Sequence, residues 1–207
     1  FPYPGTEEYS ILTNNCFILT WNDTPIGLVI DQIAHALLSL PEALQKLVHI
    51  DINQEQRKIS LFQEIHTTED RSAAAAALCT YWRIHQKFRV LEGWRSELYP
   101  VYGPNNKLLW SIERSASALF GTVTYGVHLT AFTRDSSSRY GIKLWIPRRA
   151  KTKQTFGGML DNTVGGGIAV GEEPLDSLTR EAEEEAGLEK DMVRKKVKPC
   201  GTVTYNY

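Results

Sequence analysis

Chemistry-bearing residues are concentrated in one acidic stretch, where Glu181, Glu184 and Glu185 stand at positions i, i+3 and i+4. A helix turns by about 100° per residue, so these three carboxylates are expected to share one helical face. Like charges at this spacing destabilise a helix by about 0.2–0.5 kcal/mol per pair unless a cation lies between them. Carboxylate oxygens are ligands that Mg²⁺ and Mn²⁺ prefer. The spacing therefore indicates a divalent-cation site suited to phosphate-ester chemistry; the alternative is a solvated acidic face.

The element that must position these carboxylates is a helix beginning near Pro174 and ending near Gly187. Proline suits the first helical turn, where its missing N–H is not needed, and glycine suits the position just past the last turn. A second face of this helix is apolar and is expected to pack on a sheet. Its residues are Leu175, Leu178, Ala182 and Ala186.

The acidic helix belongs to a longer pattern with fixed gaps. Five residues separate Gly166 from Glu172, and seven more lead to the run from Arg180 to Leu188. This pattern resembles the complete Nudix box: a glycine, five positions, a glutamate, seven positions, then Arg-Glu, an aliphatic residue, Glu-Glu, Gly and an aliphatic residue at their set places. The resemblance implies a Nudix domain, an α/β/α sandwich around a mixed sheet, and hydrolysis of a diphosphate bond.

The resemblance also implies roles for individual residues. Glu181, Glu184 and Glu185 would be ligands of Mg²⁺ or Mn²⁺, and Glu172 would support the metal site from the loop before the helix. One of these glutamates, or a carboxylate outside the box, would help to deprotonate the attacking water. The expected catalytic set is Glu181, Glu184 and Arg180.

Three further box residues have structural roles in this resemblance. Arg180 would orient the carboxylates through salt bridges. Gly166 would allow a tight bend between strand and loop, and Gly187 would end the helix.

Residues 1–115 show alternating strand and helix signals and no catalytic spacing, so we expect an N-terminal α+β domain there. Asp31 is predicted to cap a helix that runs to about Leu40, and Thr67 or Thr68 to cap a later one. Turn residues at 103–106 predict a hairpin. The strands expected in this domain are 17–21, 26–30, 97–102 and 108–112.

Residues 116–207 are expected to form the Nudix domain, which gives the chain an α+β, or α/β, fold class. Val123–Phe132 is predicted to be one long strand and Ile142–Ile146 another. Further strands and a closing helix follow in the resembled family, so the domain is expected to be truncated at Tyr207. His128 has the place of a structural strand histidine, and Asp161 with Asn162 that of a turn.

A basic loop precedes the box and contains Arg148, Arg149, Lys151 and Lys153. Arg148 and Arg149 are the predicted substrate-binding residues, because guanidinium groups grip diphosphates well. The alternative is a solvated loop, which we favour for the two lysines.

Segments 98–103, 120–130, 144–149 and 158–164 resemble one Nudix subfamily, described as related to thiamine pyrophosphokinase, whose members have an extra N-terminal domain. This resemblance implies hydrolysis of thiamine diphosphate, and of its oxidised or toxic analogues, to the monophosphates. Alternatives are a nucleotide substrate such as ADP-ribose or 8-oxo-dGTP, and a non-catalytic binding module. Aromatic residues would suit the cationic thiamine ring, although an aromatic residue in a strand more often belongs to the core; the candidates are Trp94, Trp110, Tyr125 and Trp145.

The composition excludes little. A net charge of −1 gives no global field toward nucleic acid or anionic membrane, so the bulk charge says nothing about the partner. The small-molecule diphosphate expected as partner is implied by the Nudix resemblance. Apolar runs do not reach membrane-spanning length, and the three separated cysteines suit a reducing, cytoplasmic location. Organelle targeting stays open because the chain does not begin with Met, and a homodimer is an option by analogy only.

Overall fold

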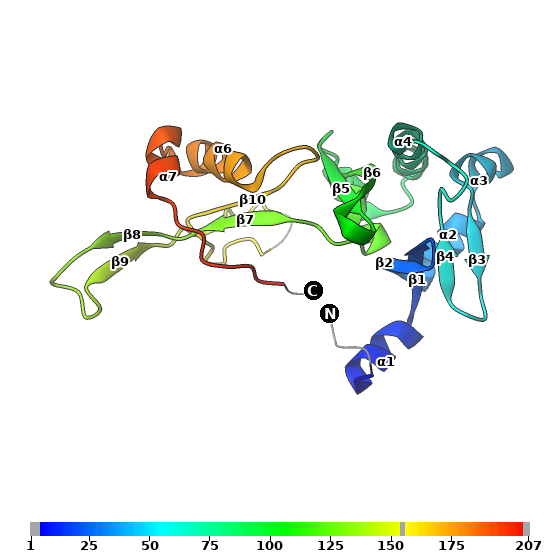
Figure 1. Cartoon of the computed structure of the whole chain (residues 1–207), viewed down its shortest axis with the longest axis horizontal. Helices are drawn as coiled ribbons and strands as arrows, with labels where there is room; N and C mark the ends of the chain where they lie inside the picture. Colours follow the sequence, from blue (N-terminus) through cyan, green and yellow to red (C-terminus); the bar gives the residue numbers. More distant parts are fainter. Residues whose placement is uncertain (1–4, 154–155, 205–207) are drawn as a thin grey trace. The chain divides into compact units, whose positions relative to one another are not determined.

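The computed structural model describes residues 5–153 and 156–204. Their contacts divide the chain into two compact units, and the helices and strands of both are labelled in Figure 1. Unit 1 comprises the described residues of Phe1–Thr124 and Thr202–Tyr207, and unit 2 is Tyr125–Gly201. No helix in the described ranges is long and apolar enough to cross a membrane.

Unit 1 is built on a four-stranded mixed sheet in the order β2-β1-β4-β3. Its β1–β4 pair is parallel, whereas β1–β2 and β3–β4 are antiparallel. A separate antiparallel hairpin joins β5 to β6, as the turn residues at 103–106 predict. The strands are β1 Cys16–Trp21, β2 Thr24–Ile30, β3 Asp51–Asn53, β4 Lys58–Ser60, β5 Leu98–Tyr102 and β6 Leu108–Glu113.

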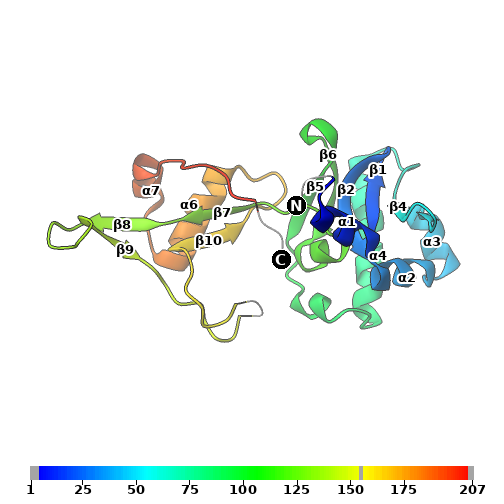
Figure 2. The same ribbon diagram turned by 90° about the horizontal axis from the view of Figure 1, so that it is seen from below.

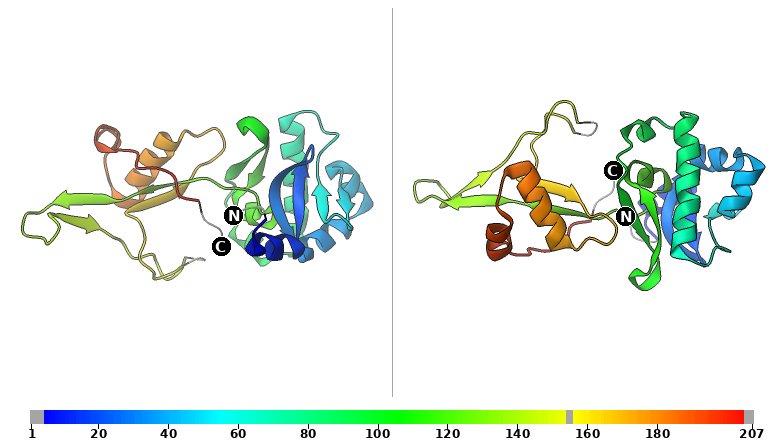
Figure 3. Two further views of the ribbon diagram at one scale, coloured as in Figure 1. Left: turned by 60° about the horizontal axis from the view of Figure 1, so that its bottom comes forward. Right: turned by 90° about the horizontal axis from the view of Figure 1, so that it is seen from above.

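The core of unit 1 forms where helix α4 packs on β6, an arrangement visible in Figure 3. Thr67 caps α4 as predicted, because its side chain accepts a hydrogen bond from the Asp70 amide at 3.0 Å. The largest core side chains are Trp82 and Trp110, each at most 1 % exposed. The helices of this unit are α1 Glu7–Asn14, α2 Asp31–Leu38, α3 Glu42–Val48, α4 Thr68–Ile84, α5 Arg114–Ser117, and the 3₁₀ turns η1 Arg89–Gly93, η2 Pro104–Asn106 and η3 Ala118–Phe120.

The predicted cap at Asp31 is wrong. Asp31 is the first residue inside α2, and the capping position, Ile30, makes no side-chain cap bond. The Asp31 carboxylate is instead paired with Arg57 at 2.5 Å. The carboxylate thus forms an ion pair with the turn before β4 instead of a local capping bond.

Unit 1 extends to Thr124, beyond the boundary expected at residue 115. Phe120 is buried in the core of unit 1, and Gly121 lies against strand β2. A β-carbon on Gly121 would stand 2.0 Å from the Leu28 carbonyl oxygen, and the backbone φ there is +55°. Only glycine allows both this approach and this conformation, which explains how the segment after α5 docks onto the sheet.

Unit 2 contains two antiparallel strand pairs, β10–β7 and β8–β9. The long strand predicted over Val123–Phe132 is wrong, because the chain changes partner at Thr130. Before it, β7 pairs with β10; after it, β8 pairs with β9. Figure 2 shows the β8–β9 hairpin extending away from the β7–β10 pair. The strands are β7 Gly126–Leu129, β8 Ala131–Arg134, β9 Ile142–Trp145 and β10 Val164–Gly167.

Helix α6, Pro174–Ala186, covers one face of the β7–β10 pair and packs against α7, Lys190–Lys196. Pro174 occupies its first turn and Gly187 ends it with a φ of +63°, both as predicted. Its buried face differs in part from the predicted one. Leu178 and Ala182 are buried, but Leu175 is 41 % exposed and Ala186 is also exposed. The small polar residues Ser177 and Thr179 are buried with them, and Ser177 lies against Gly167 of β10.

Candidate active site on the acidic helix

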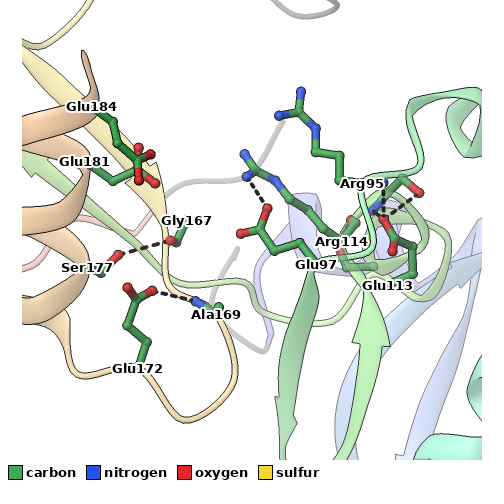
Figure 4. Close-up of polar contacts among 12 residues, drawn as sticks. Arg95, Glu97, Glu113, Arg114, Gly167, Ala169, Glu172, Ser177, Glu181 and Glu184 are labelled. Carbon is green, nitrogen blue, oxygen red and sulfur yellow. Dashed lines mark hydrogen bonds and ion pairs between the residues drawn. The ribbon is translucent and has the colours of Figure 1, made fainter.

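One side of α6 contacts the three glycines of β10 in succession. The hydroxyl of Ser177 donates to the Gly167 carbonyl at 3.1 Å, as Figure 4 shows. One turn later, the side chain of Glu181 lies against Gly166. At the next turn, Glu185 accepts a hydrogen bond from the Gly165 amide at 3.2 Å. Side chains four residues apart on a helix lie one above another, so this stripe runs antiparallel to β10.

The position of Gly166 has no room for a side chain. A β-carbon built there would stand 2.2 Å from Cδ and 2.4 Å from Oε1 of Glu181. The carboxylate of Glu181 therefore occupies the volume that any other residue would fill. Its side chain is only 13 % exposed, so the strand backbone fixes where this carboxylate can lie.

Arg180 gathers the carboxylates of the site. Its Nε and Nη2 donate to the two oxygens of Glu172 at 2.9 and 3.1 Å, a two-pronged pair. Its Nη1 donates to Glu181 at 2.8 Å and lies 3.5 Å from Glu184. The predicted orienting contacts of Arg180 are therefore present in the structure.

The electrostatics of this cluster follow from the Arg180 fork. Its hydrogen bonds hold the pKa of Glu172 below the ordinary value. In turn, the hydrogen bonds to Glu172 and then to Glu181 raise the pKa of Arg180 further above its already high value. Both groups therefore stay charged at neutral pH. The positive charge of the Arg180 guanidinium thus offsets the mutual repulsion of Glu172, Glu181 and Glu184.

The chemistry of the donors fits a hard divalent cation, because the site consists of carboxylate oxygens. Glu181 and Glu184 reach toward the same Arg180 nitrogen, and Figure 4 shows both projecting to one side of α6. Within residues 5–153 and 156–204, however, no three acidic, histidine or cysteine side chains surround a single point as ligands would. The carboxylates of Glu181 and Glu184 point to the Arg180 guanidinium. Cation binding would therefore require these side chains to turn from the guanidinium toward the ion.

Two predicted metal residues occupy other places in the structure. Glu185 is turned to the Gly165 amide, away from the Arg180 cluster. Glu172 has both oxygens on Arg180 and also accepts the Ala169 amide at 3.3 Å. This geometry suits Glu172 to a supporting role from the loop. Direct ligation by Glu172 and Glu185 stays a prediction.

The basic loop before the box is internally tied. Arg148 donates to the Gly158 carbonyl at 2.7 Å, and Arg149 pairs with Asp161 at 2.5 Å. These contacts join the two ends of the loop, an observation that favours a structural role for both arginines. Their predicted role in binding substrate stays a prediction. Lys151 and Lys153 are exposed, as a solvated loop requires.

Asp161 and Asn162 lie at the end of this loop, but the turn predicted for them is not formed, because their polar groups are engaged in side-chain contacts. The carboxylate of Asp161 accepts the Asn162 amide at 2.8 Å, and the Asn162 side chain meets Nδ1 of His128 at 3.1 Å. Burial raises the pKa of Asp161, but the hydrogen bonds from Arg149 and Asn162 outweigh it and leave the pKa lowered. His128 thus has a polar partner within the domain, which fits its expected structural role.

The aromatic candidates differ in burial. Trp110 is buried in the core of unit 1, where it meets the ring of Phe62 edge-on. Trp94 is partly buried beneath the guanidinium of Arg83. Trp145 and Tyr125 are 61 % and 41 % exposed.

Sequence reasoning missed Ser177. Serine inside a helix carries no signal by itself, and position 177 falls in the gap that the box leaves free. The available clue was its place four residues before Glu181, on the stripe that meets the glycines.

Comparisons with known proteins agree with this architecture. The family described as "Domain of unknown function (DUF4743)" matches residues 7–124, and the NUDIX domain matches residues 124–205. The chain therefore belongs to the Nudix superfamily and carries a DUF4743 domain ahead of its Nudix domain.

Several curated proteins are similar to the chain. Uncharacterized protein YJR142W of Saccharomyces cerevisiae is 38 % identical over 117 residues, 56 % of this chain and 34 % of that protein. Nudix hydrolase 20, chloroplastic, of Arabidopsis thaliana is 33 % identical over 148 residues, 71 % of this chain and 38 % of its own length. Nudix hydrolase 24, chloroplastic, of the same plant is 32 % identical over 148 residues, with 71 % and 39 % covered. The chain thus spans between a third and two fifths of these relatives.

Proposed function

We propose that this protein is a metal-dependent hydrolase that cleaves the P–O–P bond of a small-molecule diphosphate. The observation that carries the proposal is the Arg180 cluster, which holds Glu172, Glu181 and Glu184 together on the Nudix box helix. Two similar plant proteins are named Nudix hydrolases, which supports the same class of reaction. Glu181 and Glu184 are the proposed ligands of Mg²⁺ or Mn²⁺, with Glu185 as a third.

A bound divalent cation would neutralise charge on the diphosphate and lower the pKa of a coordinated water. The residues of the chain supply position and proton transfer. Arg180 and Gly166 fix Glu181, while Glu184 is 57 % exposed and lies 3.5 Å from Arg180 at the open side of the cluster. The water oxygen forms a bond to phosphorus as the bridging P–O bond breaks. The water proton passes to a carboxylate, for which Glu184 is the best placed, and the leaving phosphate keeps the bridging oxygen.

The test of this proposal is the pair Glu184→Gln and Glu183→Gln. Both residues are exposed on α6, but Glu183 pairs with Lys190 at 2.9 Å and stands at a variable box position. We expect Glu184→Gln to lower metal-dependent turnover by about 10²–10⁴-fold, the usual contribution of an acid–base group. Glu183→Gln should retain activity, and both variants should keep the wild-type thermal midpoint. Full activity of Glu184→Gln would refute the proposal.

For the substrate we propose thiamine diphosphate and its oxidised or toxic analogues, which would be hydrolysed to the monophosphates. The resemblance of segments 98–103 and 120–130 to the thiamine pyrophosphokinase-related subfamily supports this choice. The exposed ring of Trp145 offers a surface for a cationic ring.

A substrate panel separates this proposal from its alternatives. Binding of oxythiamine diphosphate, ADP-ribose and 8-oxo-dGTP is measured by calorimetry. The formation of the monophosphate product from each is measured by chromatography, with and without Mg²⁺. Preference for the thiamine compound supports the proposed substrate. Preference for either nucleotide would show that the enzyme acts on nucleotide diphosphate derivatives instead. Binding without turnover in all arms would indicate a non-catalytic module.

A further inference from the structure

Ser177 is a buried hydroxyl that the Nudix pattern does not account for. It is 0 % exposed, and its Oγ donates to the carbonyl of Gly167 at 3.1 Å. This bond joins the first half of α6 to the last residue of β10 (Figure 4). A buried hydroxyl needs such a partner, because leaving it unpaired costs free energy.

The bond of Ser177 lies at one end of a series of three contacts. Glu185 bonds Gly165 at the other end, and Glu181 is pressed on Gly166 between them. Two directed hydrogen bonds therefore fix how far α6 can slide along β10. The carboxylate of Glu181 has its place set by that register, because its space is the one left by the missing side chain of Gly166.

Ser177 also lies beside Glu172. Its hydroxyl is one of the groups that lower the pKa of the Glu172 carboxylate. The hydroxyl itself donates to the Gly167 carbonyl, so Ser177 links β10 to the surroundings of Glu172. Since Glu172 holds two nitrogens of Arg180, a shift of Ser177 would pass to Arg180 and then to the carboxylates on its Nη1.

We propose that Ser177 is a positioning residue that sets the register of α6 on β10 and thereby places Glu172, Arg180 and Glu181 for cation binding. This inference rests on the proposed function. It assigns a role to a residue that touches neither the cation nor the substrate.

Thr179 provides a matched control. It stands two residues along the same helix, is 2 % exposed, and its hydroxyl donates to the Asp176 carbonyl at 2.9 Å. That bond stays within α6 and reaches neither β10 nor the Arg180 cluster. Thr179→Val removes a buried hydroxyl without touching the contacts that Ser177 makes.

The experiment measures Mn²⁺ binding by electron paramagnetic resonance, with thermal unfolding as a check on folding. We expect Ser177→Ala to weaken Mn²⁺ binding about tenfold, the usual effect of losing a partner behind the ligands. Thr179→Val should bind Mn²⁺ within about twofold of wild type, because its lost hydrogen bond does not reach the groups behind the ligands. If Ser177→Ala does not fold, Ser177→Cys fills the same volume with a much weaker donor and takes its place.

Wild-type Mn²⁺ affinity in the Ser177 variant overturns the inference. An equal loss in Thr179→Val also overturns it, because the effect would then reflect general weakening of the helix. Glu181→Gln separates the two proposals. If Glu181→Gln binds Mn²⁺ like wild type, the metal site itself is wrong. If Glu181→Gln loses binding while Ser177→Ala does not, only the positioning role fails.

A double-mutant cycle tests the route through Glu172. If Ser177 acts through that carboxylate, Ser177→Ala combined with Glu172→Gln should lose no more Mn²⁺ affinity than the worse single variant. Additive losses would show that Ser177 does not act through Glu172 and would overturn that part of the inference.

Discussion

The carboxylate of Glu181 lies in the space where a side chain of residue 166 would be. Cγ, Cδ and Oε1 of Glu181 all come within 2.4 Å of the ideal β-carbon position of Gly166. The glycine is thus needed for close approach, and no positive φ is recorded for it. A sequence feature expected to permit a chain bend instead makes room for a predicted ligand.

Gly166→Ala should damage the site more than the fold. The atoms in its way belong to the far end of a flexible side chain, so Glu181 can swing aside at a cost of about 1 kcal/mol. The displaced carboxylate leaves Arg180 and the predicted cation position. We expect Mn²⁺ affinity and turnover to fall at least about tenfold, measured by titration and by phosphate release.

Glu181→Ala is the background in which this variant is tested again, because it removes the atoms that fill the β-carbon position of Gly166. Gly166→Ala should cost little extra stability in that background, so the two changes should be non-additive in urea unfolding. Equal costs of Gly166→Ala with and without the Glu181 side chain would contradict the close approach.

Arg180→Lys should weaken the site although the charge is kept. Lysine has a single ammonium and cannot reproduce the planar fork that holds both oxygens of Glu172 and reaches Glu181. We expect Mn²⁺ binding to weaken by about tenfold or more. Arg194→Lys is the control, because Arg194 makes its recorded ion pair with Asp176 through one nitrogen. Equal tolerance of both substitutions would show that the fork is not required.

Asp161→Asn should reveal a pH-dependent contribution to stability. Arg149 and the Asn162 amide leave the pKa of folded Asp161 below its ordinary value of 3.8. The stabilisation is therefore complete above that value and is lost as pH falls through the lowered pKa. At neutral pH we expect the variant to be less stable by about 1 kcal/mol, as for a partly exposed charged hydrogen bond.

The measurement for Asp161 is urea unfolding of wild type and variant from neutral pH down to about pH 3. The two stability curves should converge toward the acidic end. Curves that stay parallel over the whole range would mean that Asp161 does not titrate with a lowered pKa in the folded protein.

Much of the box helix could be predicted because its signals are local. Pro174 and Gly187 begin and end α6 through backbone preferences that need no tertiary context. The gaps between Gly166, Glu172 and Arg180 placed these residues in one predicted site, and in the structure Arg180 pairs with Glu172 while Gly166 lies against Glu181.

The rest depended on contacts between distant segments. The cap predicted at Asp31 was lost to Arg57, which lies 26 residues away in sequence. The strand break at Thr130 follows from a change of pairing partner that propensity does not encode. Leu175 is exposed although Ala182, two turns later on the same helical face, is buried, a difference that helical periodicity alone does not predict.

The burial of two tryptophans separates structural aromatics from candidate ligand-binding ones. Trp110 is 1 % exposed in the core, so Trp110→Ala should cost about 3–5 kcal/mol. Trp145 is 61 % exposed, and Trp145→Ala should change stability by no more than about 0.5 kcal/mol.

If Trp145 meets the cationic ring of the proposed substrate, its loss should raise KM for thiamine diphosphate about three- to fivefold. A diphosphate ester without a ring serves as the control substrate, because it has nothing to stack on the indole. Steady-state kinetics of wild type and Trp145→Ala with both substrates measure the difference. An equal rise in KM for both would show that Trp145 acts on the shape of the β8–β9 hairpin and not on the ring.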